Sequence, residues 1–125
     1  ISSVAGRLAL PYMAGYCATK FALNALSTGL RMELAREGVR VVVVCPGRVK
    51  TEFRHNMRLT GSRLPDVMRR RESTGITAEE VARVTLRALR SGRRMVVVPW
   101  RLRLAIGFRA LLPKVFDAVL PRMMG

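Results

Sequence analysis

Two short apolar runs are the clearest predicted strands in this sequence. The first spans Val39–Cys45 and is closed by Pro46-Gly47, and the second spans Met95–Val98 and is closed by Pro99. Runs that are nearly apolar throughout, without polar alternation, are typical of strands covered on both faces, as in parallel sheets. The pattern therefore predicts two buried strands, each followed by a proline.

A stretch with apolar residues at helical spacing precedes each of these strands. From Tyr12 to about Glu37 apolar residues recur with a helical period, and Gly38 stands where a glycine commonly ends a helix. A second helix is predicted from Thr77, with Thr77 as N-cap and Glu80 three residues later, to about Arg90. Gly92 is expected to end it.

The predicted order is a strand end, a helix, a strand, a long loop, a helix and a strand. Such alternation favours an α/β fold with a parallel sheet and right-handed crossovers. Two strands and a strand end cannot complete such a sheet. Because the chain also opens on Ile1 rather than Met, we expect further chain on the amino-terminal side.

Composition and charge exclude several classes of protein. Half of the residues are hydrophobic and the formal net charge is +15, which is globular but strongly basic. The basic residues are spread along the chain, Arg69–Arg71 being the only tight cluster, and few aromatic residues accompany them. We therefore expect no nucleic-acid partner. No run approaches the ~20 apolar residues of a spanning helix.

The cysteines and the histidine form no metal motif. Cys17 and Cys45 stand singly, without a CxxC spacing, and His55 lies alone in a polar stretch. This pattern predicts no metal and two reduced structural thiols, which is typical of a cytoplasmic protein.

Tyr16 and Lys20 are the first candidates for chemistry. Residues four apart on a helix share one face, with Cβ atoms ~5–6 Å apart. An adjacent ammonium favours the phenolate form of a tyrosine, and such a phenol can exchange a proton with a reacting oxygen. A Tyr-Lys pair at this spacing is common, however, so the pair alone is weak evidence.

The surrounding motifs make the pattern specific. Ile1–Gly6 reads ISSVAG, Pro11 follows, Tyr16–Lys20 gives YxxxK, and Pro46–Thr51 gives PGxVxT. This series, in this order and spacing, resembles the short-chain dehydrogenase/reductase family. The resemblance is close over residues 1–51 and looser to Pro99. It implies the carboxyl-terminal half of a Rossmann-type, doubly wound parallel sheet.

The resemblance also implies the catalytic residues. Ser3 would hydrogen-bond the substrate oxygen, and Tyr16 would be the general acid in reduction and the general base in oxidation. Lys20 would bind the nicotinamide ribose and favour the tyrosinate. Ser2 is the weaker candidate, since alternate residues of a strand point to opposite faces, and it is expected to support the strand or its loop.

A nicotinamide cofactor, NAD or NADP, follows from the same resemblance. Its contacts would come from Tyr16 and Lys20 and from the PGxVxT motif through Pro46, Gly47, Val49 and Thr51. The sequence contains no GxxxGxG motif, which would receive the pyrophosphate at a helix amino terminus. By itself this chain is therefore expected to be inactive, and the preference between NAD and NADP cannot be read.

The chain is expected to divide into two regions. Residues 1–99 would form part of the cofactor-binding domain, with a substrate loop at 52–76 in which Arg54, Arg58 and Arg63 are mainly a solvated surface. Residues 100–125 would form an amphipathic basic tail. That tail suits peripheral contact with an anionic membrane, packing over the substrate site, or contact with a partner subunit.

The functional prediction is an NAD(P)-dependent oxidoreductase that interconverts an alcohol and a ketone or aldehyde. It is expected to be a homodimer or homotetramer in the cytoplasm, with possible peripheral contact at the membrane. Two alternatives remain: an epimerase or dehydratase of the extended type, which shares YxxxK, and a non-catalytic basic membrane-surface module. The PGxVxT motif and the short tail favour the first reading over the epimerase, and joint retention of Ser3, Tyr16 and Lys20 disfavours the module.

Overall fold

The computed structural model describes residues 1–51 and 75–124. In chain order its elements are the 3-10 turn η1 (Val4–Gly6), helix α1 (Ala14–Glu33), the 3-10 turn η2 (Leu34–Glu37), strand β1 (Val43–Pro46), helix α3 (Ala78–Arg90), strand β2 (Met95–Val98), and helices α4 (Leu102–Leu111) and α5 (Pro113–Met124). The fold is α/β, as the sequence pattern predicts.

The two strands are parallel neighbours. Val43 is paired with Met95 and Pro46 with Val98, so the register covers all four residues of each strand. On its other edge β1 meets the amino-terminal segment, because the Ser2 amide donates to the Val44 carbonyl at 2.8 Å. This arrangement is a partial Rossmann-type sheet, and it confirms the predicted fold class.

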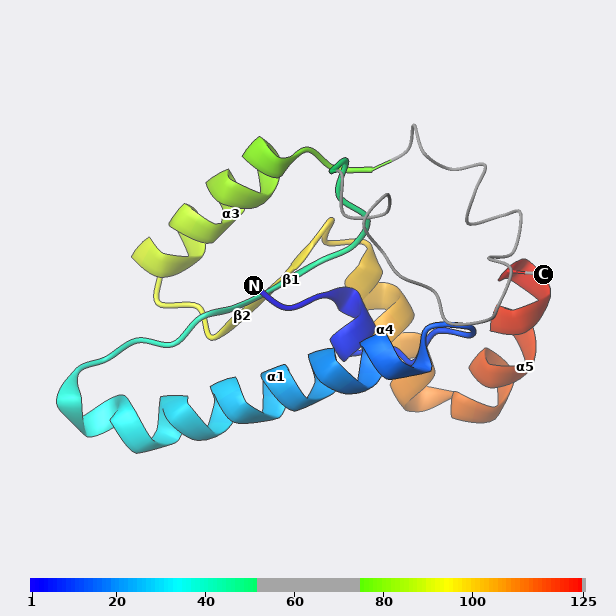
Figure 1. The fold of residues 1–125 in the computed structure, drawn as a ribbon, viewed down its shortest axis with the longest axis horizontal. Helices are drawn as coiled ribbons and strands as arrows, with labels where there is room; N and C mark the ends of the chain where they lie inside the picture. The colour runs from blue at the N-terminus through cyan, green and yellow to red at the C-terminus, as the bar shows by residue number, and fades with distance from the viewer. Residues whose placement is uncertain (52–74, 125) are drawn as a thin grey trace.

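Helices cover both faces of these strands, and Figure 1 shows α1 and α3 on opposite sides of them. On the α3 side, Val44 and Val96 pack with Ala88 of that helix. On the other side, Val97 packs against the cluster of Val4, Leu8 and Phe116. Successive residues of β2 thus face opposite layers, as strand geometry requires. The apolar runs are therefore strands covered on both faces, as predicted.

The first strand is shorter than predicted and displaced toward its carboxyl end. Val39–Val42 lie outside β1, and Val39 is exposed. The partner strand begins only at Met95, so the ladder starts at Val43, whose amide donates to Arg94 O at 3.0 Å. Just before it, the Arg31 guanidinium donates to the Val41 carbonyl at 3.1 Å. The Arg31 side chain thus supplies the hydrogen bond that a neighbouring strand would otherwise donate to Val41.

The helix boundaries follow the predicted signals. Gly38 ends the first helical region with a left-handed φ of 73°, a conformation that glycine adopts without steric cost. The Thr77 hydroxyl accepts a hydrogen bond from the Glu80 amide at 3.2 Å and caps α3. Gly92, just after α3, has a φ of 65°. The predicted caps of both helical regions are therefore confirmed.

Turn η1 packs directly on helix α1 at Gly6. A Cβ atom on Gly6 would lie 2.7 Å from the Lys20 carbonyl oxygen and 2.6 Å from Asn24 Nδ2. The Asn24 amide donates to the Gly6 carbonyl at 2.8 Å and is itself buried. Only glycine allows the two backbones to approach this closely.

Gly6→Ala is therefore expected to destabilise the protein by about 1–3 kcal/mol, because the added methyl group must push back the carbonyl of Lys20. Gly29→Ala in α1 is the matched control, since its Cβ would meet only Glu33 Oε1, at an ordinary 3.7 Å. That variant should gain roughly 0.5–1 kcal/mol from helix propensity. Urea unfolding of both variants measures the difference. Equal effects of the two substitutions would contradict the close approach at Gly6.

Candidate active site

Tyr16 and Lys20 lie one turn apart near the start of α1. Both side chains are half-buried, and Lys20 Nζ lies 5.6 Å from the centroid of the Tyr16 ring. At this distance an ammonium is attracted to the ring of a tyrosine. The shared face predicted from the YxxxK spacing is thus present, with the positive charge over the phenol.

Ser3 lies at the N-cap of η1, between α1 and the end of β1. Its hydroxyl oxygen accepts a hydrogen bond from the Ala5 amide at 3.1 Å, and the hydroxyl donates to the Pro46 carbonyl at 3.5 Å. The second bond is long and therefore weak. The hydroxyl proton of Ser3 can consequently be redirected to another acceptor at small cost, while the Ala5 amide holds the oxygen in place.

Ser2 is buried and ties the amino-terminal segment to two elements. Its amide bonds to Val44 in β1, and its hydroxyl donates to the Lys20 carbonyl at 3.5 Å. Neighbouring Ser3 is less buried. The structure thus gives Ser2 a bracing position and leaves Ser3 as the more accessible hydroxyl of the pair.

Asn24 is a residue that the sequence reasoning missed. It continues the spacing of Tyr16 and Lys20 by one more turn, so it occupies the same face of α1. Its side chain is buried at 7 % exposure, and its amide nitrogen holds the Gly6 carbonyl. The spacing of i, i+4 and i+8 with a polar residue at each position is the signal that could have identified it. Asn24 positions the turn carrying Ser3 against the helix carrying Tyr16 and Lys20.

The PGxVxT residues lie at the carboxyl end of β1. Pro46 is buried and belongs to the strand, and the Gly47 amide donates to the Val98 carbonyl at 2.6 Å. A Cβ atom on Gly47 would lie 2.5 Å from Leu102 Cδ1. The packing of α4 therefore supplies a reason for glycine at this position, in addition to the approach of a ligand that the resemblance implies.

Val49 and Thr51 follow on the same edge of the sheet. Val49 is half-buried and forms an isolated parallel bridge with Ile76, while Thr51 is exposed. In open α/β sheets ligands bind outside the carboxyl ends of the strands. The bridge gives this segment a fixed place at that edge of the sheet.

These residues fit one end of a nicotinamide dinucleotide. Lys20 supplies a half-buried ammonium and Thr51 an exposed hydroxyl, which are donors suited to ribose and carboxamide oxygens. A site for the pyrophosphate requires a glycine-rich turn, and the sequence lacks the GxxxGxG motif. The chain therefore offers groups for the nicotinamide half of the cofactor.

The thiols lie in the interior. Cys45 has no exposed surface, and burial raises its pKa, against smaller lowering effects of Arg7 and of a hydrogen bond from Ser2. Cys17 is also buried and accepts a hydrogen bond from the Leu10 amide at 3.4 Å. Within residues 1–51 and 75–124 no three His, Cys, Asp or Glu side chains gather as a metal site would require.

Most of the predicted substrate loop lies outside the described residues. This applies to positions 52–74, including His55, Arg54, Arg58 and Arg63, and to the Arg69–Arg71 cluster. Gly75 and Ile76 alone of the 52–76 segment are described, and the Ile76 amide donates to the Arg48 carbonyl at 3.0 Å. The end of the loop is thus anchored beside the PGxVxT segment.

Comparison with known proteins identifies the family. The model of the short chain dehydrogenase family matches residues 1–61. Dehydrogenase/reductase SDR family member 7B of Xenopus laevis is 34% identical over 121 residues, which cover 96% of this chain and 38% of that protein. The uncharacterized oxidoreductase YbbO of Escherichia coli K12 is 42% identical over 64 residues, covering 51% of this chain and 24% of that protein.

A human relative extends the similarity over nearly the whole chain. The 17-beta-hydroxysteroid dehydrogenase 13 is 29% identical over 126 residues, covering 98% of this chain and 38% of that protein. The chain thus spans 38% of the length of the relatives that it matches end to end. From the family match and these relatives, which agree with the motifs and the partial Rossmann-type sheet, we conclude that the chain belongs to the short-chain dehydrogenase/reductase family of oxidoreductases.

Proposed function

We propose that this chain supplies the proton-transfer groups of an NAD(P)-dependent oxidoreductase that interconverts an alcohol and a ketone or aldehyde. The observation that carries the proposal is the placement of Lys20 Nζ 5.6 Å from the ring centroid of Tyr16. The ammonium and the phenol thus lie together on one face of α1, where a positioned phenol can exchange a proton with a substrate oxygen. The nicotinamide cofactor, NAD or NADP, supplies or accepts the hydride when bound.

Each of the three polar side chains has a separate task in this proposal. Ser3, held by the Ala5 amide, redirects its hydroxyl proton from Pro46 to the substrate oxygen. Tyr16 gives a proton to that oxygen in reduction and removes one in oxidation. Lys20 places its ammonium beside the Tyr16 ring and donates to the nicotinamide ribose. Val49 and Thr51 line the nicotinamide end of the site.

In the full-length enzyme, Tyr16→Phe is expected to reduce turnover by ~10²–10⁴-fold, because phenylalanine keeps the ring but removes the acid–base group. The dissociation constant of the cofactor should change only a few-fold. Reduction of a panel of ketones and aldehydes with NADH or NADPH measures the first effect, and quenching of cofactor fluorescence the second. Tyr12→Phe is the matched control, since Tyr12 is exposed and is the other tyrosine of the chain. Activity of Tyr16→Phe within a few-fold of the parent would remove Tyr16 from the mechanism.

In the full-length enzyme, Lys20→Ala is expected to weaken cofactor binding, because the variant loses the ammonium that donates to the nicotinamide ribose in this proposal. Turnover at saturating cofactor should fall as well, since the cation beside the Tyr16 ring is lost. Cofactor titration and steady-state rates measure the two effects separately. Lys114→Ala, at an exposed lysine of α5, provides the control. Cofactor binding and turnover that both stay at the parental level would remove Lys20 from the site.

We further propose that the protein is a homodimer or homotetramer in the cytoplasm and that α1 contributes to its interface. Large apolar side chains are exposed on α1: Phe21, Leu26 and Met32 are 42%, 60% and 70% exposed, with Leu26 about 120–140° around the helix from the other two. Polar Asn24 and half-buried Arg31 face inward instead. Exposed apolar side chains spread over this much of a helix suit contact with another protein surface.

Leu26→Glu is accordingly expected to shift the protein to a smaller species in sedimentation velocity, since a carboxylate cannot be buried unpaired in an apolar interface. Leu86→Glu on α3, where the leucine is similarly exposed at 56%, should leave the assembly unchanged. A parent that sediments as a monomer, or a Leu26→Glu variant with the parental assembly, would refute the interface.

A further inference from the structure

Helix α4 has two apolar sides, and the second is packed only at Phe108, whose ring centroid lies 6.1 Å from that of the buried Phe116. Leu102, Ala105 and Ile106 lie against the cluster of Val4, Leu8 and Phe116. The opposite side carries Leu104 and Leu111, which are 66% and 82% exposed. Exposed apolar side chains gathered on one side of a helix indicate a surface that meets another apolar phase.

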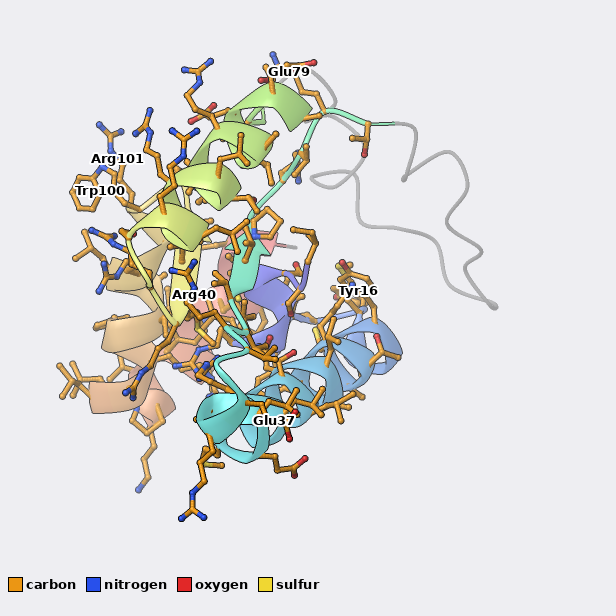
Figure 2. All side chains as sticks on the ribbon, turned by 90° about the vertical axis from the view of Figure 1, so that its left-hand side faces the viewer. Tyr16, Glu37, Arg40, Glu79, Trp100 and Arg101 are labelled. Carbon is orange, nitrogen blue, oxygen red and sulfur yellow. The ribbon has the colours of Figure 1, made fainter. Side chains whose placement is uncertain are left out.

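Four side chains make up this surface, which we call the tail face: Trp100, Leu104, Phe108 and Leu111. The turn before α4 continues its helical path, because the Arg103 amide donates to the Trp100 carbonyl at 2.9 Å. With 3.6 residues per turn, the four positions then fall within a sector of about 80°. Arg101 and Arg103 fall on the two borders of that sector. Figure 2 shows Trp100 and Arg101 side by side on the outside of the molecule.

The charged residues of α4 and of the turn before it are all basic: Arg101, Arg103 and Arg109. Between Glu80 and Asp117 the sequence holds nine basic residues and no acidic residue. Eight of the nine are exposed, Arg109 being half-buried, where it lies 3.8 Å from Asp117. The exposed Arg101 and Arg103 at the borders of the tail face are therefore complementary to a dense layer of negative charge.

The geometry excludes α4 as a membrane-spanning helix. The helices in the described part of the chain are too short or too polar to cross a membrane. Ten residues of α4 extend only ~15 Å, about half of the hydrocarbon thickness of a bilayer. A helix of this length with an apolar centre and arginine borders suits the plane of the lipid headgroups, where the arginine stems lie along the apolar phase and the guanidinium groups reach the phosphates.

We propose that the tail face docks in the plane of a bilayer containing anionic lipids. The apolar side chains enter the boundary between headgroups and acyl chains, and Arg101 and Arg103 bind lipid phosphates on both sides of them. Figure 2 shows Trp100 and Tyr16 on opposite sides of the molecule. A bilayer on the tail face consequently leaves the Tyr16 side of the molecule open.

The test is co-sedimentation of the protein with vesicles of phosphatidylcholine and phosphatidylserine in a 7:3 ratio, and with vesicles of phosphatidylcholine alone. Binding to the mixed vesicles should be the stronger and should weaken, without vanishing, as salt is raised from ~0.1 M to ~0.5 M. The double variant Leu104→Ser/Leu111→Ser should lower the partition coefficient by about tenfold or more. Arg103→Gln should lower it by about fivefold.

Leu86→Ser on α3 is the matched control. Leu86 is exposed to a similar degree as Leu104, 56% against 66%, but it lies outside the tail face. Vesicle binding by Leu86→Ser should equal that of the parent. All variants should keep the parental melting temperature and oligomeric state. Equal losses in Leu86→Ser and in the double variant would overturn the proposal, because the attraction would then be general surface charge.

Two other results would also overturn it. The first is a parent that fails to bind the mixed vesicles. The second is a double variant that binds vesicles like the parent but loses its assembly state or its melting temperature, because the tail face would then be covered by protein. Neither result bears on Tyr16 or Lys20, so the proposed oxidoreductase function is tested separately.

Discussion

The close approach of turn η1 to helix α1 is the contact on which the candidate active site depends. Ser3 belongs to the segment on one side of this contact, and Tyr16 and Lys20 to the helix on the other. Gly6 leaves room for the Lys20 carbonyl, and the buried Asn24 amide fixes the distance between the two backbones. Ser2 adds a second tie, to β1 and to Lys20. The hydroxyl and the phenol therefore share one frame, although their separation in the sequence is thirteen residues.

Sequence patterns predicted the features whose causes are local. Four-residue spacing puts Tyr16 and Lys20 on one face of a helix, the left-handed φ of Gly38 follows from glycine's freedom, and the Thr77 cap needs only the amide of Glu80. Features that depend on distant partners were missed or wrong. Val39–Val42 have strong strand propensity but lie outside the short ladder with β2, and Arg31 satisfies the Val41 carbonyl instead. The role of Asn24 depends on Gly6, eighteen residues away.

Helix α1 shows why periodicity identifies a helix more readily than the face that it buries. Phe21, Leu26 and Leu30 recur at helical spacing, yet they point outward, while Asn24 points into the fold. Some of these inward polar groups have partners: the Asn24 amide nitrogen donates to the Gly6 carbonyl at 2.8 Å and Arg31 to the Val41 carbonyl at 3.1 Å, while the buried Asn24 Oδ1 accepts no hydrogen bond from the described residues. A polar inner face is tolerable to the extent that its buried groups are paired, because burial is costly for polar groups left without partners. The exposed apolar side chains of α1 are then available for contact with another protein surface.

Helices α1 and α4 both present outward apolar faces, but the charges beside them differ, and this difference separates their proposed partners. Beside the α1 face stand both Arg36 and the acidic Glu33 and Glu37, so opposite charges can pair across a contact with a second protein surface. Helix α4 and the turn before it carry only basic charges, Arg101, Arg103 and Arg109. Two copies of such a face would repel each other, whereas a sheet of lipid phosphates neutralises every arginine at once. The apolar area alone gives attraction in both cases, and the sign of the surrounding charge determines which surface is bound.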